Sequence, residues 1–411
     1  MGISAWSIAA VLALSTASRP VEAALGPRVH LGGQSFATAK PPSRLATLHW
    51  NAVARTLVAR NRIDPLWSVR TYALLSIAQH DAIAAVEMRF GSGVNVPSAA
   101  EAVEDAAIAA ASATVLNRVL PGELPYLSDA LQAHKDALLS DGASAEAVSE
   151  GAEIGRRAAK RVMQLREDDG ADNLFAVSPL PGPSAWSANP RSNTHYALRP
   201  LWGSVRPFFL SRSSQFRPVS PPPRGSAEFE RALRAVRTTS QSRTREQVQT
   251  ARYWDDGGGT ATPPGHWNSL AAEIIVQRGL TNRESARVLA LLNIAMMDAS
   301  IACWEAKYTY WLLRPSQADT SIRTVISVPN FPSYPSGHAA FSGAASEVLA
   351  RLFPDDSARV RALADEAAQS RVFAGLHYPF DSTAGLIQGR EIAQLVLTQF
   401  QVRYPLVDQL R

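Results

Sequence analysis

The chain has 411 residues, of which 46% are hydrophobic and 19% charged, a composition that is typical of a folded globular protein and excludes an intrinsically disordered chain. This length is enough for two domains, each with a core of its own. The net charge of +5, from 41 basic and 36 acidic residues, is not gathered in a long basic block, so the sequence indicates an anionic ligand rather than nucleic acid.

The first 23 residues have the features of a secretory signal peptide. Ile3–Leu14 is a short apolar run, and Ala23 supplies the small residue of a cleavage site, although no Lys or Arg precedes the apolar run. We therefore expect an exported protein, periplasmic or secreted; a buried N-terminal helix is the alternative. After residue 24 no stretch has about 18 uninterrupted apolar residues, so no membrane span is expected.

Helical periodicity predicts an N-terminal helical bundle as the domain of residues 24–167. The first part of this domain, residues 24–44, is expected to be an extended arm. Asp64 and Pro65 form a good helix start, because an N-cap residue is followed by proline at the first helical position. The expected helices are 45–61, 65–88, 100–120, 126–139 and 144–167.

Residues 168–225 interrupt the helical pattern with many Pro, Ser, Gly and aromatic residues. A long irregular segment of this kind is usually a linker or a functional loop. Its aromatic side chains, among them Trp186, Trp202 and Phe216, need a surface to pack on. We therefore expect an irregular crossover laid against the C-terminal helices, and aromatic side chains left exposed there would suit a homodimer contact.

The helical pattern returns in residues 226–411 and predicts a second helical bundle. Gly257–Gly259 is not a phosphate-binding loop, since no Gly-Lys-Ser/Thr follows it, so no nucleotide is expected. His266 is expected on a turn between helices, where it lines a pocket mouth or caps a helix. The single cysteine, Cys303, excludes an intramolecular disulfide and is expected in the core. The expected helices are 227–237, 244–253, 268–278, 282–310, 339–353, 356–369 and 379–399.

Three short segments in the last quarter of the chain carry an unusual set of polar residues. They contain Lys307 with Arg314-Pro315, then Pro335-Ser336-Gly337-His338, then Ser370-Arg371 with His377 and Asp381. Arg presents a planar fork that matches two oxygens, whereas Lys acts as a point charge. Together with a Ser hydroxyl and two imidazoles, these side chains predict a binding site for a tetrahedral oxyanion.

Both histidine segments are expected at the starts of helices. The segment Pro335-Ser336-Gly337-His338 opens the apolar helical run 339–353, and Pro379 suits the first position of the helix after His377. The free N–H groups and the positive dipole end of each helix would then face the anion. Gly337 also lets the backbone come close, because it has no Cβ.

The order and spacing of the segments are Lys-x6-Arg-Pro, Pro-Ser-Gly-His and Ser-Arg-x5-His-x3-Asp. They resemble the signature of the superfamily that vanadium-dependent haloperoxidases share with type-2 phosphatidic-acid phosphatases (PAP2), acid phosphatases included. The resemblance is specific over residues 250–400 and general elsewhere. It implies that the oxyanion is bound by Lys307, Arg314, Ser336, Gly337, His338, Arg371 and His377.

The resemblance also implies roles. With vanadate as the cofactor, His377 is the metal ligand, Asp381 fixes its tautomer, His338 is the acid–base catalyst, and Lys307 polarises bound peroxide. Hydrogen peroxide then oxidises halide to hypohalite, which halogenates a small organic acceptor, and no haem takes part. With a phosphate ester bound, His377 is instead the nucleophile that forms a phosphohistidine, and His338 protonates the leaving alcohol.

Flanking residues favour the peroxidase. Trp304 and Phe331 resemble residues beside the cofactor in haloperoxidases and, with His266, are expected to line the substrate or halide pocket. The His-Tyr-Pro sequence that contains Tyr378 is instead familiar from the phosphatases.

We therefore expect an exported all-α protein of two helical bundles, with the oxyanion site in the C-terminal bundle. The function that these residues favour is a vanadate-dependent haloperoxidase. A secreted acid phosphatase is the first alternative, and a non-catalytic oxyanion-binding protein is the second.

Overall fold

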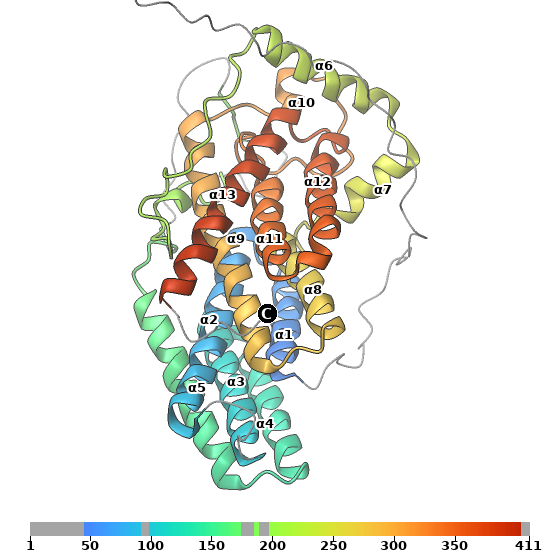
Figure 1. Ribbon diagram of the computed structural model, residues 1–411. Helices are drawn as coiled ribbons and strands as arrows, with labels where there is room; N and C mark the ends of the chain where they lie inside the picture. Colours follow the sequence, from blue (N-terminus) through green and yellow to red (C-terminus); the bar gives the residue numbers. More distant parts are fainter. Residues whose placement is uncertain (1–44, 92–97, 174–184, 189–196, 404–411) are drawn as a thin grey trace, which may run out of the picture. The chain divides into compact units, whose positions relative to one another are not determined.

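α-Helices account for nearly all of the regular structure (Figure 1). The computed structural model describes residues 45–91, 98–173, 185–188 and 197–403. Within these ranges it has thirteen α-helices and no β-strand, so the expected all-α fold is confirmed. The expected signal peptide (1–23), the arm (24–44) and part of the crossover lie outside the described residues.

The helices follow the expected order. The N-terminal helices are α1 (Ala46–Arg60), α2 (Pro65–Phe90), α3 (Ser98–Val119), α4 (Leu124–Ser140) and α5 (Ala145–Leu165). The C-terminal helices are α6 (Ala227–Ser242), α7 (Arg245–Tyr253), α8 (Thr262–Gln277), α9 (Asn282–Tyr310), α10 (Pro315–Ala318), α11 (Gly337–Leu352), α12 (Ser357–Phe373) and α13 (Pro379–Arg403). Short 3-10 helices lie at Pro121–Glu123, Trp202–Ser204 and Pro354–Asp356.

Two helix starts show how the local sequence determines the elements. Asp64 caps α2 as expected, and its Oδ1 accepts hydrogen bonds from Leu66 N and Trp67 N at 3.0 Å each. The start of α8 was placed too late by the sequence, because the helix already begins at Thr262. Prolines 263 and 264 fit there because the first turn of a helix has no acceptors for their missing N–H groups.

Helix α9 is the central element of the C-terminal half and packs against α2, α8, α11 and α13. Its length and mean hydropathy of 1.5 would suffice to cross a membrane, but its most apolar 18-residue window is 100% buried inside the protein. A core helix has the same properties, and the neighbours of α9 identify it as one. The absence of a membrane span stays a prediction.

Two hydrophobic clusters supply most of the core. One lies among α1 to α5 and includes Trp50 and Leu116. The other joins α1 and α2 to α8, α9, α11, α12 and α13, and includes Leu66, Trp267 and Val396. All described residues belong to one compact unit, and the division into two bundles stays a prediction.

The described end of the crossover lies along α9 and is fixed there by buried polar groups. The fully buried carboxylate of Asp298 accepts hydrogen bonds from the N–H groups of three consecutive crossover residues, 208–210, at 2.7, 2.8 and 3.1 Å. Further along α9, Trp304 Nε1 donates to Leu198 O at 3.1 Å. Removing either partner would leave a buried polar group unsatisfied, so these contacts hold the segment in one position.

Small residues bring α11 and α13 into close contact. A Cβ at Gly389 of α13 would lie 2.2 Å from Ala340 O of α11, and one at Gly385 would lie 2.5 Å from Ser336 O. Such distances are below van der Waals contact, so the helices approach this closely only because both positions are glycine. The contact sets the distance between the two histidine segments, which lie at the starts of these helices.

We predict that Gly389→Ala destabilises the protein by about 1–3 kcal/mol, because the new methyl group must push α13 away from α11. The matched control is Gly122→Ala, where an added Cβ meets nothing within 4 Å. Chemical denaturation of both variants measures the difference. Equal stability of the two variants would contradict the close helix contact.

Candidate active site

The structure brings the three polar segments together at the ends of four helices. Lys307 lies in the last turn of α9, and Arg371 in the last turn of α12. Ser336 caps α11, and His377 precedes α13, whose first turn contains Asp381. The helix start expected at Pro379 is confirmed, and α11 begins at Gly337, two residues before the expected start at Ala339.

Lys307 is fully buried and donates to three backbone oxygens of one loop. Its Nζ lies 2.8 Å from Pro332 O, 2.9 Å from Ser333 O and 2.5 Å from Pro335 O. Burial lowers the pKa of this ammonium group, since it makes no salt bridge among the described residues. The loop accepts hydrogen bonds from all three N–H groups of Lys307. Lys307 can therefore attract an anion by its charge, but it can donate a hydrogen bond to the anion only if it gives up one of these carbonyl oxygens.

Arg314 reaches the imidazole of His377. Its Nε donates to Phe331 O at 3.0 Å, and its Nη1 donates to Leu376 O at 3.1 Å and to His377 Nε2 at 2.9 Å. Its Nη2 is buried and has no partner among the described residues. Backbone oxygens thus fix the guanidinium group, and its Nη2 can donate hydrogen bonds to a bound anion.

His377 is held by Asp381 in one tautomer. His377 Nδ1 lies 2.8 Å from Asp381 Oδ2, which also accepts from Ser333 Oγ at 2.5 Å and from Tyr378 N at 3.1 Å. Burial, together with Arg314 and Lys307, lowers the pKa of His377 well below its usual value. The imidazole is therefore neutral, with its proton on Nδ1 and its lone pair on Nε2.

Ser333 was missed by the sequence analysis. Its hydroxyl donates to the carboxylate that orients His377, although it belongs to none of the three motifs. The only sequence signal is its place two residues before the Pro-Ser-Gly-His segment, and a hydroxyl there is too common to be informative alone.

Arg371 and His338 share a loop that ends α7. Arg371 Nη1 donates to Trp254 O at 2.7 Å, while its Nε is buried without a partner among the described residues. His338 is hydrogen-bonded to the backbone of Asp255 and Trp254, and its buried Nε2 has no partner in the part of the chain that the structure describes. Burial, and after it Arg371, lowers the pKa of His338 well below its usual value, so this imidazole is also neutral.

Trp304 and Phe331 contact these charged groups. Their ring centroids are 4.9 Å apart, and the Phe331 ring lies 5.0 Å from Lys307 Nζ and 4.9 Å from the Arg314 guanidinium carbon. A Cβ at Gly337 would lie 3.3 Å from the Trp304 ring. The two aromatic side chains therefore form an apolar wall beside the cations, and their role in lining a halide pocket stays a prediction.

His266 differs from the sequence expectation, because it lies inside α8 and not on a turn. Its Nδ1 lies 3.2 Å from both carboxylate oxygens of Asp256, and its ring stacks on Trp254 with centroids 4.4 Å apart. Its position therefore fixes the loop that contacts Arg371 and His338. It caps no helix.

The charges of this cluster do not balance. Three buried cations, Lys307, Arg314 and Arg371, surround one buried carboxylate, Asp381, and none of the three forms a salt bridge among the described residues. Asp255 and Asp256, both partly exposed, act on Arg371 from further away. Buried charges and N–H groups without partners are costly, so the cluster requires an anion with several oxygens.

The donor set also indicates what kind of group fits. In the described part of the chain no three His, Cys, Asp or Glu side chains are grouped as ligands for a bare metal cation. Nitrogens of Arg314, Arg371 and His338 that have no partner among the described residues instead suit an oxyanion such as phosphate or vanadate. The lone pair on His377 Nε2, to which Arg314 Nη1 donates, would become available if that guanidinium turned toward the anion.

Sequence comparisons place the C-terminal region among known proteins. Residues 287–405 match the model of the PAP2 superfamily. Vanadium chloroperoxidase of Curvularia inaequalis is 26% identical in an alignment of 238 residues that covers 45% of this chain and 39% of that protein. The non-specific acid phosphatase of Providencia stuartii is 29% identical over 113 residues, 26% of this chain and 46% of that protein. The matches thus span less than half the length of either relative.

Comparisons with solved structures extend the likeness to the N-terminal helices. The first bacterial vanadium-dependent iodoperoxidase has a TM-score of 0.74 and 24% identity, covering 86% of this chain and 95% of that chain. The holo form of a bacterial vanadium-dependent chloroperoxidase has a TM-score of 0.67 and 16% identity, covering 83% and 93%. The fold is therefore that of the vanadium haloperoxidases, and the resemblance to the superfamily is confirmed.

We predict that Lys307→Ala or Arg371→Ala weakens vanadate binding at least tenfold, because each side chain supplies about 1.5 kcal/mol or more to the bound anion. Isothermal titration calorimetry measures the affinity. Arg278→Ala is the control, since Arg278 pairs with Asp355 and Asp356 at the surface. An affinity unchanged in both site variants would contradict the assignment.

We also predict that the protein takes up a proton when it binds sulfate at about pH 8.5. Burial lowers the pKa of Lys307, so part of the anion-free protein carries a neutral amine at this pH. A bound anion adds negative charge and raises that pKa again. Titrations in buffers of different ionisation enthalpy measure the uptake. Proton release, or equal uptake by Lys307→Met, would contradict this sign.

Proposed function

We propose that the protein is a vanadate-dependent haloperoxidase, which uses hydrogen peroxide to oxidise halide to hypohalite. The observation that carries this proposal is the set of three buried cations around a neutral histidine whose Nδ1 is bound by Asp381. That arrangement neutralises a trivalent oxyanion and leaves one imidazole lone pair for its central atom. The similarity to enzymes named as peroxidases and phosphatases supports a catalytic role.

Each residue would have a defined task. Arg314, Arg371 and Lys307 would hold vanadate by charge, with hydrogen bonds from the two guanidinium groups, Ser336 and the Gly337 amide. His377 would bind vanadium through Nε2, because Asp381 keeps the proton on Nδ1. When bound, vanadate supplies the Lewis acidity that activates peroxide toward a halide ion.

His338 would move the proton of the incoming peroxide. Its neutral imidazole has an unpartnered Nε2, so it can accept a proton and return it to the leaving water. Arg371 lies next to it and opposes its protonation, which keeps the base free at neutral pH. The Trp254–Asp255 backbone fixes the ring.

Two observations favour the peroxidase over the phosphatase. Trp304 and Phe331 lie against the cations, where their apolar rings would exclude water and suit a halide ion. The sequence match to vanadium chloroperoxidase covers 45% of the chain, whereas the match to the acid phosphatase covers 26%.

The first alternative is a secreted acid phosphatase, supported by the His-Tyr-Pro sequence that contains Tyr378 and by the match to the acid phosphatase. In that case His377 Nε2 would attack phosphorus, forming a phosphohistidine while His338 protonates the leaving alcohol. A non-catalytic oxyanion-binding protein is the second alternative, and the presence of both histidines opposes it. For every alternative we propose export, on the evidence of the apolar run Ile3–Leu14.

The deciding experiment uses the exported chain without residues 1–23, stripped of anions by a chelator in phosphate-free buffer. One half is reloaded with orthovanadate, and both halves are assayed for peroxide-dependent bromination and for aryl-phosphate hydrolysis. Bromination that appears only with vanadate supports the peroxidase. Hydrolysis without vanadate, inhibited by vanadate and without bromination, would overturn it in favour of the phosphatase.

We predict that His377→Ala abolishes vanadate-dependent bromination, because the central atom loses its protein ligand. The control is His80→Ala on α2, a histidine outside the site. Steady-state bromination rates of both loaded variants measure the effect. Turnover in His377→Ala at the level of His80→Ala would contradict the ligand assignment.

A further inference from the structure

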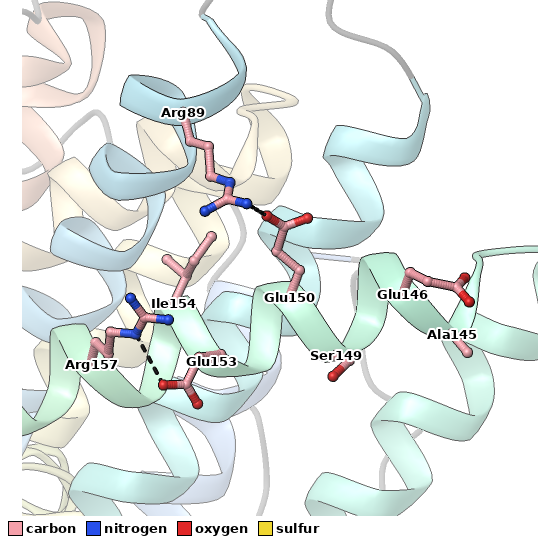
Figure 2. A pocket seen from close by; sticks show the side chains of 8 residues that line it. All are labelled: Arg89, Ala145, Glu146, Ser149, Glu150, Glu153, Ile154 and Arg157. Atoms are coloured by element: carbon pink, nitrogen blue, oxygen red, sulfur yellow. Dashed lines mark hydrogen bonds and ion pairs between the residues drawn. The ribbon is translucent and has the colours of Figure 1, made fainter.

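Two hollows outside the oxyanion site differ in their chemistry. The first, of about 620 Å³, lies along α5 and is lined mostly by charged side chains (Figure 2). Arg89 pairs there with Glu150, and Arg157 with Glu153, so little charge is left for a ligand. The second, of about 920 Å³, lies between the proline-rich residues 218–223 and α13.

The second hollow, here called the proline cavity, has aromatic and aliphatic walls. Phe216, Tyr334, Phe380 and Ile387 line it together with the prolines of 218–223. Ile387 is 51% exposed at its edge. A concave apolar site of this volume is the kind that holds a small organic molecule.

The wall opposite α13 is fixed in place. Tyr310 donates its hydroxyl to Pro218 O and Tyr334 donates to Val219 O, both at 2.7 Å. The buried Gln388 of α13 donates its Nε2 to Phe216 O at 3.1 Å. Because these bonds tie the irregular segment to α9, the Tyr334 loop and α13, the proline cavity is formed before any ligand arrives.

The charged side chains of the lining determine which sign of charge a ligand should carry. Glu228 and Glu391 are exposed at the cavity and form no salt bridge within the described residues. The one cation of the lining, Arg217, is paired with Glu305 outside it. An apolar cavity whose lining has two carboxylates outside the salt bridges of the described residues favours a flat hydrophobic body that carries a positive charge.

Chain continuity connects the proline cavity to the oxyanion site. Tyr334 follows Ser333 and Phe380 precedes Asp381, and the Phe380 ring stacks on Tyr378 with centroids 4.9 Å apart. A molecule in the cavity would therefore touch the segments that hold the carboxylate of Asp381.

We propose that the proline cavity binds an arylalkylamine, a phenol or indole with an ammonium side chain, as the organic acceptor of this enzyme. Binding is independent of the proposed function, whereas the role as acceptor rests on it. In that role hypohalous acid transfers its halogen to a ring carbon, the ring loses a proton, and water is the other product. The aromatic ring would lie against the proline and phenylalanine walls, with its ammonium group toward the carboxylates.

The test is calorimetric titration with tyramine at low salt, without vanadate, peroxide or halide. The matched probe is 3-(4-hydroxyphenyl)propionate, which has the same ring and a carboxylate. We expect tyramine to bind about tenfold more tightly than the propionate, because two carboxylates attract one and repel the other at low ionic strength. No binding of tyramine, or equal affinity for both probes, would overturn the proposal.

Two variants locate the binding. Ile387→Arg places a cation at the exposed edge of the cavity and should abolish tyramine binding, whereas Val276→Arg, at an exposed apolar position of α8, should not. Joint replacement of Glu228 and Glu391 by Gln should weaken tyramine severalfold and leave the neutral 4-ethylphenol unchanged. Tyramine binding that survives Ile387→Arg would overturn the location. Binding without bromination by the vanadate-loaded enzyme would remove only the acceptor role.

Discussion

Three positive charges buried around one imidazole are the constraint on which the site depends. Lys307 and Arg314 come from the end of α9 and the residues after it, Arg371 comes from α12, and each is fixed by backbone oxygens instead of carboxylates. Without an anion such an arrangement opposes folding, since each unpaired buried charge costs several kcal/mol. When an oxyanion binds, the attraction between it and these charges stabilises the complex. The rest of the fold supplies the rigidity that keeps them together.

That rigidity comes from contacts some distance from the anion. Asp298 and Trp304 hold the crossover on α9, and glycines of α13 allow it to approach α11. The loop 254–256, clamped by His266, presents its backbone to Arg371 and His338. Each contact is paired or close-packed, so the histidines have few alternative positions.

The sequence predicts many of the helices and most of the site residues, whereas contacts that depend on the folding of loops leave no pattern in it. The start of α13 at Pro379 and the pairing of His377 with Asp381 follow from local spacing, which a single sequence shows. The contact of Ser333 with that carboxylate depends on how a loop folds back, and spacing does not encode it. The carbonyls that occupy Lys307 are likewise backbone groups without a sequence signal.

The most direct test of the central claim is a crystal structure of the vanadate-loaded protein. Arg314 Nη1 donates to His377 Nε2 in the structure, so binding through that nitrogen requires Arg314 to turn toward an anion oxygen. We expect vanadium bonded to Nε2, with Arg314 and Arg371 donating to its oxygens. Vanadate bound elsewhere, with Arg314 still donating to His377, would contradict the account.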